Sequence, residues 1–519
     1  MKADRLLLSS ETMAAIDRES RNRFGIPGDI LMENAGRGVY ERIAQHGPAP
    51  LVCLAGGGNN GGDAMVVARW AHIAGWDDIV VILGQAPRDG LPQRQLAILR
   101  ALAVTVHRWG EDEERERCVA ALERAAIVVD GLAGSGLQGD LREPALALAK
   151  ALNGASAWTV SIDVPSGLHD AAGPDAPVVR ADLTVVTGCA RPAMYDPLLR
   201  HFCGEIRRVE PGFPPGLVEE LAGERTAGLL AEDTDHPEPP RPEDHKTLRG
   251  RVLVVGGGPS GYGAPVLAAL GARASGCGMI RLAGPPESAA AALAADPSIM
   301  TLPFPGGEAP SAELLAWADA LVLGPGWTGA TDAECAAWIS AARSAGCALL
   351  IDASALGLLA DPNGASLKAL RAPRGAASPE AAPLVLTPHP GEWRRVQGAL
   401  GREEVGIAAA LVAQDPPPGE IWVVRGATTW ISGPASGPLV LDGRCPALAH
   451  AGTGDLLAGL IAGSLARVAA RGGPRDERAW TDAVVWAVVR HLHAGRQAGI
   501  DGGPESAHTL AQRLMEMPL

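Results

Sequence analysis

The sequence predicts an α/β protein built from two doubly wound domains, each a mostly parallel sheet with helices on both faces. Short apolar runs alternate with helical patterns along most of the chain, as they do where a parallel sheet is covered on both sides. A buried strand followed by a glycine loop and a helix occurs twice, from residue 51 and again from residue 251. The length of 519 residues also exceeds what one ordinary hydrophobic core spans, so two domains are expected.

The N-terminal half alternates between helical and strand patterns. Helical spacing predicts helices over 10–23 and 28–45, and the apolar run 51–55 predicts a strand that leads into a helix ending near residue 74. Further strands are expected at 79–83, 103–107, 127–129, 159–162 and 183–186. From residue 211 onward prolines and acidic residues replace this pattern, which favours a linker. We therefore expect domains at 1–222 and 223–519.

The C-terminal half repeats the alternation with a different sequence. Strands are predicted at 251–255, 320–323, 348–351, 384–386 and 421–424, and an apolar helix at 456–465. The alanine- and proline-rich stretch 372–383 predicts a solvent loop.

Composition excludes several classes of function. A net charge of −14 argues against nucleic-acid binding and against anionic membranes. No stretch approaches the roughly 20 apolar residues of a membrane helix, and the short patch Leu6–Leu8 does not form a signal peptide. The eight cysteines form no C-x-x-C pair, so neither a zinc site nor a disulfide framework is predicted, as expected of a cytoplasmic protein.

The run Gly452-Thr453-Gly454-Asp455 stands directly before the predicted helix at 456–465. Its glycines allow bare backbone amides to point one way at a helix N-terminus, which suits a phosphate. Asp455 could take the proton from a hydroxyl that attacks that phosphate. The alternative is a glycine-rich loop capped by an acid for helix stability alone.

In the N-terminal half four segments are predicted to be loops at strand ends, where ligands of open parallel sheets bind. They are 56–63, which departs from the G-x-G-x-x-G spacing, 130–137, 163–168 and 32–36. Oxygen ligands from Asn60, Asp130 and Ser166 would suit a hard monovalent cation. For any single loop, a tight turn without a ligand is the alternative.

These motifs, Asn-Asn-Gly-Gly-Asp, Asp-x-x-x-Gly-Ser-Gly-Leu and Asp-Val-Pro-Ser-Gly-Leu in this order, resemble the NAD(P)H-hydrate epimerase family over about residues 9–222. The resemblance implies a Rossmann-like three-layer sandwich that interconverts the R and S epimers of hydrated NADH and NADPH (NADHX and NADPHX) at C6 of the nicotinamide ring. It places Asp163 beside the reacting ring as acid/base, and K⁺ on Asn60, Asp130 and Ser166. The substrate would be lined by Asn59, Asn60, Gly61, Gly62, Asp63, Gly134, Ser135, Gly136, Leu137, Gln138, Gly139, Asp140 and Asp163.

The C-terminal half carries further glycines and acids at predicted strand ends. They occur in Gly261–Pro265, Gly324–Trp327, Asp352–Leu356, Thr387–Glu392 and Arg425–Thr429. Glu392 or Asp352 could organise Mg²⁺, and Arg425 could bind nucleotide phosphates. A purely structural role is the alternative for His389.

In this order the motifs resemble the ribokinase-like fold, a three-layer sandwich, and more narrowly NAD(P)H-hydrate dehydratase over about residues 225–519. The resemblance implies phosphorylation of the hydrate hydroxyl by ADP with Mg²⁺, and Asp455 as the catalytic base. It places the hydrate against Ala264, Gly326, His389 and Asp455. The nucleotide would lie against Arg425, Gly426, Ala427, Thr428, Gly452, Thr453 and Gly454.

Some positions depart from the two family patterns. Ala64, Met65, Ala133 and Arg191 alter the walls of the epimerase pocket, and Arg191 stands where a lysine is usual. In the other half Arg425 also replaces a lysine, Ser354 replaces a second acid, and Arg444-Cys445-Pro446 replaces Asn-Pro-Gly.

Both halves resemble successive steps of one repair pathway, which predicts a bifunctional enzyme of small-molecule substrates and a homo-oligomer. One alternative is a small-molecule kinase of the hydroxymethylpyrimidine type. Another is an N-terminal half that binds nucleotides without turning them over.

Overall fold

The computed structural model describes residues 5–110, 112–223, 226–236, 238–303, 310–372, 382–402, 405–434, 436–471, 477–500 and 506–519. The chain divides into two compact units, Met1–Leu229 with Val405–Ala413, and Leu230–Glu404 with Gln414–Leu519. Of the solvent loop predicted at 372–383, residues 373–381 lie outside the described residues.

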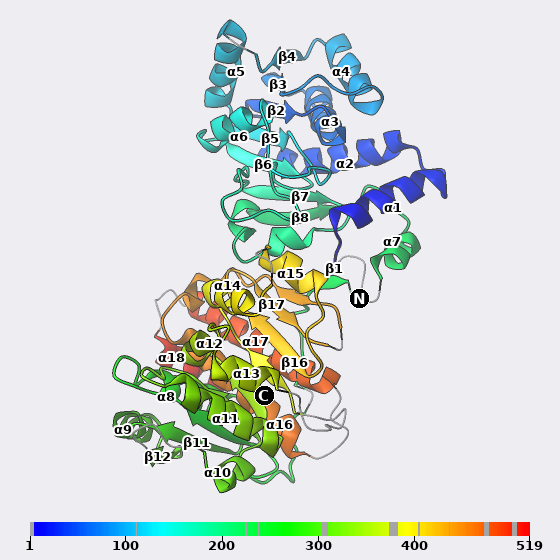
Figure 1. Ribbon diagram of the computed structural model, residues 1–519. Coiled ribbons are helices and arrows are strands. Elements are labelled where there is room, and N and C mark those ends of the chain that lie inside the picture. Colours follow the sequence, from blue (N-terminus) through cyan, green and yellow to red (C-terminus); the bar gives the residue numbers. More distant parts are fainter. Residues whose placement is uncertain are drawn as a thin grey trace. The chain divides into compact units, whose positions relative to one another are not determined.

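The first unit is built on a parallel sheet with the strand order β4-β3-β2-β5-β6-β7-β8 (Figure 1). Its strands are β2 (Leu51–Ala55), β3 (Ile79–Leu83), β4 (Thr105–Arg108), β5 (Ile127–Gly131), β6 (Trp158–Ile162), β7 (Leu183–Thr187) and β8 (Glu205–Val209). Its helices are α1 (Ser10–Asn22), α2 (Gly28–Ile43), α3 (Asn59–Ile73), α4 (Leu91–Ala101), α5 (Asp112–Arg124), α6 (Ala145–Asn153), α7 (Pro215–Ala222) and α15 (Ile407–Ala413). The short strands β1 (Leu6–Leu7) and β9 (Ala227–Leu229) pair antiparallel.

Successive residues of the central strand β2 face opposite layers of helices, because side chains alternate along a strand. Leu51, Cys53 and Ala55 are buried in one apolar cluster with residues of α2, α3 and α4. Val52 and Leu54 belong to a second cluster with residues of α5 and α6. The sheet is therefore covered on both faces, and the predicted doubly wound class is confirmed for this unit.

Two local predictions in this unit need correction, and one strand was missed. The segment 32–36 is no loop at a strand end, because it lies inside the continuous helix α2. A Cβ at Gly36 would lie 2.5 Å from Cβ of Val66, so this glycine allows α2 to touch α3 closely. Strand β4 begins at Thr105 and not at residue 103, since Ala103 has a positive φ of 54°. Strand β8 was not predicted, because its charged residues hide the apolar pattern.

The second unit has the strand order β18-β17-β16-β15-β14-β13-β10-β11-β12, parallel from β16 onward, with antiparallel pairing of β17 and β18. Its strands are β10 (Arg251–Val255), β11 (Met279–Gly284), β12 (Met300–Pro303), β13 (Ala320–Leu323), β14 (Ala348–Ile351), β15 (Leu384–Leu386), β16 (Glu420–Val424), β17 (Thr429–Ser432) and β18 (Leu439–Leu441). Its helices are α8 (Ala264–Ala274), α9 (Pro286–Ala295), α10 (Ala312–Trp317), α11 (Asp332–Ala345), α12 (Ala353–Leu358), α13 (Ala365–Arg371), α14 (Pro390–Ala399), α16 (Thr453–Ala470), α17 (Glu477–Ile500) and α18 (Ala507–Glu516).

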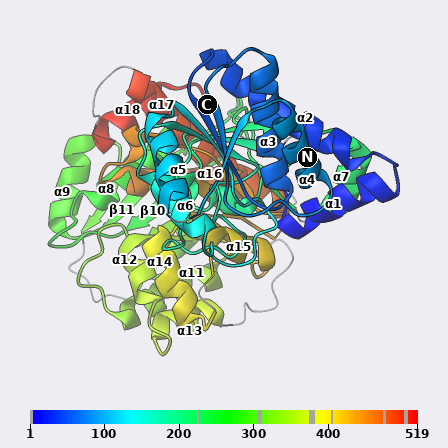
Figure 2. The ribbon, with the colours of Figure 1, turned by 90° about the horizontal axis from the view of Figure 1, so that it is seen from above.

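Two groups of helices cover this second sheet. Helices α8, α16, α17 and α18 contact one another on one side, and α11, α12, α13 and α14 form a separate group on the other (Figure 2). The first group shares a core with alternate residues of the strands, among them Val252, Val322 and Leu350. The predicted doubly wound class is thus confirmed here too.

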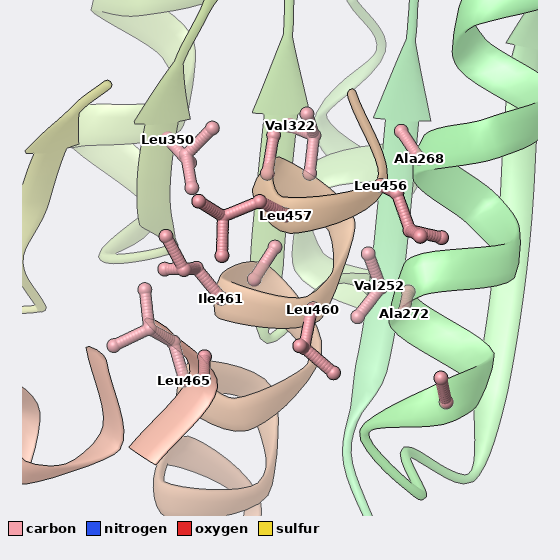
Figure 3. Packing of buried hydrophobic residues seen from close by; sticks show 14 of the residues in the cluster. Val252, Ala268, Ala272, Val322, Leu350, Leu456, Leu457, Leu460, Ile461 and Leu465 are labelled. Carbon is pink, nitrogen blue, oxygen red and sulfur yellow. The ribbon is translucent and has the colours of Figure 1, made fainter. Parts of the chain in front are cut away.

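Helix α16 is the central element of that core, and its two sides face different partners (Figure 3). Leu456 and Leu460 point toward α8 and β10, whereas Leu457 and Ile461 point toward β13 and β14. Among the described residues α16 is the one helix long and apolar enough to cross a membrane, but 83% of it is buried inside the protein. This burial is what a core helix requires.

Small residues bring α16 and α8 into backbone contact. A Cβ at Gly459 would lie 1.7 Å from the carbonyl oxygen of Ala268, and one at Gly271 would lie 2.0 Å from that of Leu456. Such distances leave no room for any side chain, so the glycines fix how closely the two helices pack.

The segment expected to be a linker is anchored to the second unit. His236 is 4% exposed, its Nδ1 accepts the N–H of Glu238 at 2.8 Å, and its Nε2 lies 2.8 Å from Oγ of Ser464 on α16. Its ring also meets Trp486 of α17 edge-on, with 4.7 Å between ring centroids. Burial, and next the charge of Arg467, lowers the pKa of His236 to about 3, so the imidazole is neutral. The proline-rich composition concealed this buried contact.

Gly459→Ala should lower the free energy of unfolding of the second unit by about 1–3 kcal/mol, because overpacking pushes α8 and α16 apart. Gly398→Ala is the matched control, since its Cβ would meet nothing within 4 Å in the exposed part of α14. That change should be neutral or stabilise by up to about 1 kcal/mol. Urea unfolding measured by tryptophan fluorescence compares the two, and equal midpoints would contradict the backbone contact.

Candidate active sites at the strand ends

In the first unit the strand order reverses between β2 and β5, the place where open α/β sheets bind ligands. The loops that leave these two strands lie against each other. A Cβ at Gly56 would lie 1.9 Å from the carbonyl oxygen of Leu132, and one at Gly61 would lie 2.0 Å from that of Gly56. The glycines of the predicted substrate loop are therefore required for this close approach, whatever ligand it binds.

Asp130, at the end of β5, is fully buried and accepts four hydrogen bonds. Its Oδ1 accepts from Oγ of Ser166 at 2.6 Å and from the N–H of Leu132 at 3.2 Å. Its Oδ2 accepts from Oγ of Ser161 at 2.8 Å and from the N–H of Ser166 at 2.9 Å. Burial raises the pKa of Asp130, and these hydrogen bonds oppose the rise. The carboxylate thus joins the loop after β5 to the loop after β6.

Of the other two residues predicted to hold K⁺, Ser166 donates to this carboxylate and Asn60 lies beside the loop after β5. Oγ of Ser166 also lies 3.0 Å from the carbonyl oxygen of Ala133. The side-chain amide of Asn60 lies beside Gly134, whose Cβ would be 3.1 Å from Cγ of Asn60. Nδ2 of Asn60 is buried and has no hydrogen-bond partner among the described residues. Amide, hydroxyl and carbonyl oxygens with a buried carboxylate fit a hard monovalent cation.

Asp163, which follows β6, is held in an unusual conformation. Its φ of 64° lies in the left-handed region, which is costly for a residue other than glycine and is often found at functional sites. Nη2 of Arg191 donates to both carboxylate oxygens at 3.0 Å, and Oγ1 of Thr187 donates to Oδ1 at 3.0 Å. Nη1 of Arg191 donates to the carbonyl oxygen of Cys189. The pair is buried, so these contacts fix the orientation of the Asp163 side chain.

Asp63 lies in the second turn of α3, the helix that follows β2. None of the described residues forms a hydrogen bond or an ion pair with its carboxyl group. Burial raises the pKa of Asp63 well above its ordinary value, and the negative charges of Asp163 and Asp17 add to the rise. Two acids with opposite environments therefore lie near each other in this unit.

The other predicted epimerase residues lie at the rim. Asn59 is exposed, and so are Gly136 and the segment Gln138 to Asp140, whereas Gly134, Ser135 and Leu137 are half-buried. Oδ1 of Asp140 lies 3.6 Å from Nε2 of His169, a residue that sequence reasoning did not identify.

In the second unit the strand order reverses between β10 and β13. A Cβ at Gly326 would lie 2.1 Å from the carbonyl oxygen of Gly261 and 2.9 Å from Cβ of Ala264. Gly326 has a φ of 60°, a conformation that glycine tolerates. The predicted hydrate residues Ala264 and Gly326 are thus brought together at this reversal.

The predicted anion-binding turn, Gly452 to Gly454, forms the N-terminus of α16. Gly452 has a φ of 90°, which orients the amides of the first helical turn outward from an 18-residue helix. A Cβ at Gly454 would lie 2.2 Å from Nη1 of Arg425, so the guanidinium lies directly against this glycine. Nη2 of Arg425 donates to Oδ1 of Asp352 at 2.7 Å. Helix N-terminus and guanidinium together favour a bound phosphate.

Asp455 stands beside this turn with a perturbed acidity. Its pKa is raised to about 7, first by burial and next by the charge of Asp352, with Arg425 opposing the rise and Glu392 adding to it. A carboxyl that titrates near neutral pH is suited to general base catalysis. Of the neighbouring predicted nucleotide residues, Thr428 is buried and Gly426 and Ala427 are exposed. The carbonyl oxygen of Ala427 accepts the N–H of Arg444 at 3.2 Å.

His389 and Glu392 form a capping box at the start of α14. Nδ1 of His389 accepts the N–H of Gly391 at 3.0 Å, and Oε2 of Glu392 accepts the N–H of His389 at 2.9 Å. The described residues contain no group of three metal-ligating side chains. One or two carboxylates with nucleotide phosphates are the usual Mg²⁺ ligands, and this arrangement fits an ion of that kind.

His491 of α17 was missed by sequence reasoning. It is 6% exposed, forms a backbone hydrogen bond with Thr453, and lies close enough to Arg425 to feel its charge. Burial, and next Arg425, lowers its pKa to about 4. A lone histidine within a long helix carries no sequence pattern that would place it next to the anion-binding turn.

Two family models match the chain. One, described as YjeF-related protein N-terminus, matches residues 28–193, and the other, described as NAD(P)H-hydrate dehydratase, matches residues 252–516. The chain is 35% identical to a bifunctional NAD(P)H-hydrate repair enzyme Nnr of Salinibacter ruber, over 89% of this chain and 88% of that protein. It is 34% identical to the enzyme of the same name from Gloeobacter violaceus, over 85% of each chain.

Similar solved structures cover the second unit. A ribokinase-like superfamily protein of Enterococcus faecalis has a TM-score of 0.44 at 24% identity, covering 56% of this chain and 94% of that one. An ADP/ATP-dependent NAD(P)H-hydrate dehydratase of Bacillus subtilis, crystallised with ATP and Mg²⁺, has a TM-score of 0.41 at 24% identity, covering 56% of this chain and 96% of that one.

Proposed function

The chain belongs to the family of bifunctional NAD(P)H-hydrate repair enzymes, and from this premise we propose that its two units catalyse successive steps. The N-terminal unit interconverts the R and S hydrates of NADH and NADPH at C6. The C-terminal unit dehydrates the S hydrate with ADP and releases AMP and phosphate. The observation that carries this proposal is the anion-binding turn with Asp455 beside it, because phosphoryl transfer needs both a charge-stabilising donor set and a base.

Dehydration requires a better leaving group than hydroxide. Asp455 takes the proton of the C6 hydroxyl while the hydroxyl oxygen attacks the terminal phosphorus of ADP, and AMP departs. The amides of Gly452 to Gly454 and the guanidinium of Arg425 stabilise the charge on the phosphoryl group in transit. The C6–O bond then breaks with its electron pair on phosphate, and loss of a proton from C5 restores the dihydronicotinamide.

Epimerisation at C6 requires that carbon to lose and regain its hydroxyl through a planar cation. The carboxyl group of Asp163 is held in one orientation by Arg191 and Thr187, so it can stabilise positive charge on the ring without reorganising. The assignment of Asp163 as acid/base remains a prediction, because its oxygens already accept hydrogen bonds.

Two ions complete the proposal. Asn60, Asp130 and Ser166 would hold K⁺, which would supply a fixed positive charge for the loops after β2, β5 and β6. Glu392 would help to hold Mg²⁺, which would neutralise nucleotide phosphates. Oδ1 would be the ligand atom of Asn60, whereas its buried, unpartnered Nδ2 is a donor that a substrate oxygen could satisfy.

The direct test supplies the purified protein with mixed epimers of NADPH hydrate, Mg²⁺, K⁺ and either ADP or ATP. We expect full recovery of the dihydronicotinamide absorbance with ADP, because epimerisation feeds all of the R hydrate to the dehydratase. Recovery that stops when the S epimer is consumed would show that the N-terminal unit does not interconvert the epimers. No recovery with either nucleotide would contradict the dehydratase assignment.

Asp455→Asn should abolish dehydration and spare epimerisation, since it removes the base from only one unit. Asp163→Asn should do the reverse. Both are measured with separated epimers, by chromatography for epimerisation and by absorbance for dehydration. Loss of both activities in either folded variant would show that the two reactions do not occupy separate sites.

The dehydratase should depend on pH through Asp455. Its pKa of about 7 means that the ionised base increases as pH rises through neutrality. From pH 6 to pH 7 the ionised fraction grows about five-fold, and kcat/KM for the S hydrate should follow. A kcat/KM that is constant over this range would show that Asp455 is not the titrating base.

A further inference from the structure

The first unit holds two acids at one sheet edge, and only one of them is bound by the protein. Asp63 follows β2 through the glycine loop, and Asp163 follows β6 directly. Strands β2, β5 and β6 are neighbours in the parallel sheet, so both residues lie beyond the carboxyl ends of its strands. The charge of Asp163 also adds to the rise in the pKa of Asp63.

Asp163 is poorly suited to donate a proton. Oδ1 accepts from Arg191 and Thr187, and Oδ2 accepts from Arg191, all at 3.0 Å. Both oxygens thus face the same buried nitrogen, Nη2 of Arg191, and a proton on either oxygen would compete with that donor. One lone pair on Oδ2 can still accept a hydrogen bond from a ligand hydroxyl.

Asp63 has the opposite environment. It is half-buried, so a ligand can reach it, and its carboxyl group has no hydrogen-bond or ion-pair partner among the described residues. Burial and the neighbouring anions Asp163 and Asp17 favour its neutral, proton-carrying form. Asp17 is itself paired with Arg21 at 2.6 Å, which leaves Asp63 as the unpaired member of the group.

We propose that Asp63 is the acid that protonates the departing C6 hydroxyl, while Asp163, held by Arg191, accepts a hydrogen bond from that hydroxyl. This inference rests on the proposed epimerase function of the N-terminal unit. The proton of Asp63 passes to the hydroxyl oxygen as the C6–O bond breaks. The electron pair of that bond stays on the oxygen, which leaves as water. The ring nitrogen shares the positive charge of the planar cation. Water then adds to the other face of C6, and the proton it releases passes through solvent to regenerate the acid form of Asp63.

This division follows a general pattern, in which two acids with different environments perform different roles. It also explains the arginine at position 191 of this chain. The guanidinium places one nitrogen, Nη2, on both oxygens of Asp163 and a second, Nη1, on the carbonyl oxygen of Cys189, whereas a lysine has a single nitrogen. Arg191 is therefore a positioning residue that acts through Asp163.

The test compares Asp63→Asn and Asp63→Glu in the full-length protein, with Asp77→Asn as the matched control at an exposed position. The probe is the separated R epimer of NADPH hydrate with K⁺ and no nucleotide, and its conversion to the S epimer is followed by chromatography. We expect kcat to fall at least about 100-fold in the Asn variant, with KM within about three-fold, because general acids contribute this much to rate. The Glu variant should recover at least about ten-fold over Asn, and the Asp77 variant should match the wild type.

Other outcomes overturn the inference or its premise. A kcat within about five-fold of wild type for Asp63→Asn, or a Glu variant no better than Asn, would show that Asp63 is not the proton donor. Calorimetric binding of NADPH hydrate establishes that the Asn variant has kept its fold. If the variant loses binding, and kcat/KM falls in proportion to that loss, Asp63 is a binding residue and not the proton donor. If the wild type itself does not interconvert the epimers, the proposed epimerase function fails instead.

Discussion

Both units depend on one geometrical constraint of parallel sheets, namely that every strand ends at the same edge. Residues far apart in the sequence meet there only because the strands between them are in register. Asp130 and Ser166 are joined in this way across β5 and β6, and Arg425 and Asp352 across β16 and β14. The helices on both faces keep the sheet dry, so hydrogen bonds at its edge act in a medium of low dielectric constant. The perturbed acidities of Asp63 and Asp455 follow from that burial.

Close backbone packing between α16 and α8 fixes the position of the second unit's site at this edge. Gly459 and Gly271 allow α16 to lie against α8, and the N-terminus of α16 carries the anion-binding turn. Any change that moved α16 outward would also move the amides of Gly452 to Gly454 relative to Arg425. Core glycines far from a ligand can therefore influence phosphate binding without touching it.

The sequence was sufficient for the fold class and for most parallel strands, because buried strands are continuous apolar runs. It was insufficient where contacts join distant segments. The sequence singled out Arg191 only as an unusual residue, and its partner Asp163 lies 28 positions away. The antiparallel strands β17 and β18 were missed because they are short and lie beyond the regular alternation. The segment 32–36 was misplaced since its glycine marks a helix contact and not a turn. The raised pKa of Asp63 depends on three-dimensional burial, which a motif does not encode.

The anchoring of residues 230–245 has a practical meaning for dissecting the protein. Arg467, 1% exposed on α16, donates to the carbonyl oxygens of Ser275 and Glu238, and Arg471 pairs with Asp244. A shortened polypeptide that starts at the first strand of the second unit would remove His236, Glu238 and Asp244 together. The buried guanidinium of Arg467 and the hydroxyl of Ser464 would then lose hydrogen-bond partners. Each unsatisfied group would lower the free energy of unfolding by about 1–3 kcal/mol. An independently expressed dehydratase half should therefore retain the chain from about Leu230 onward.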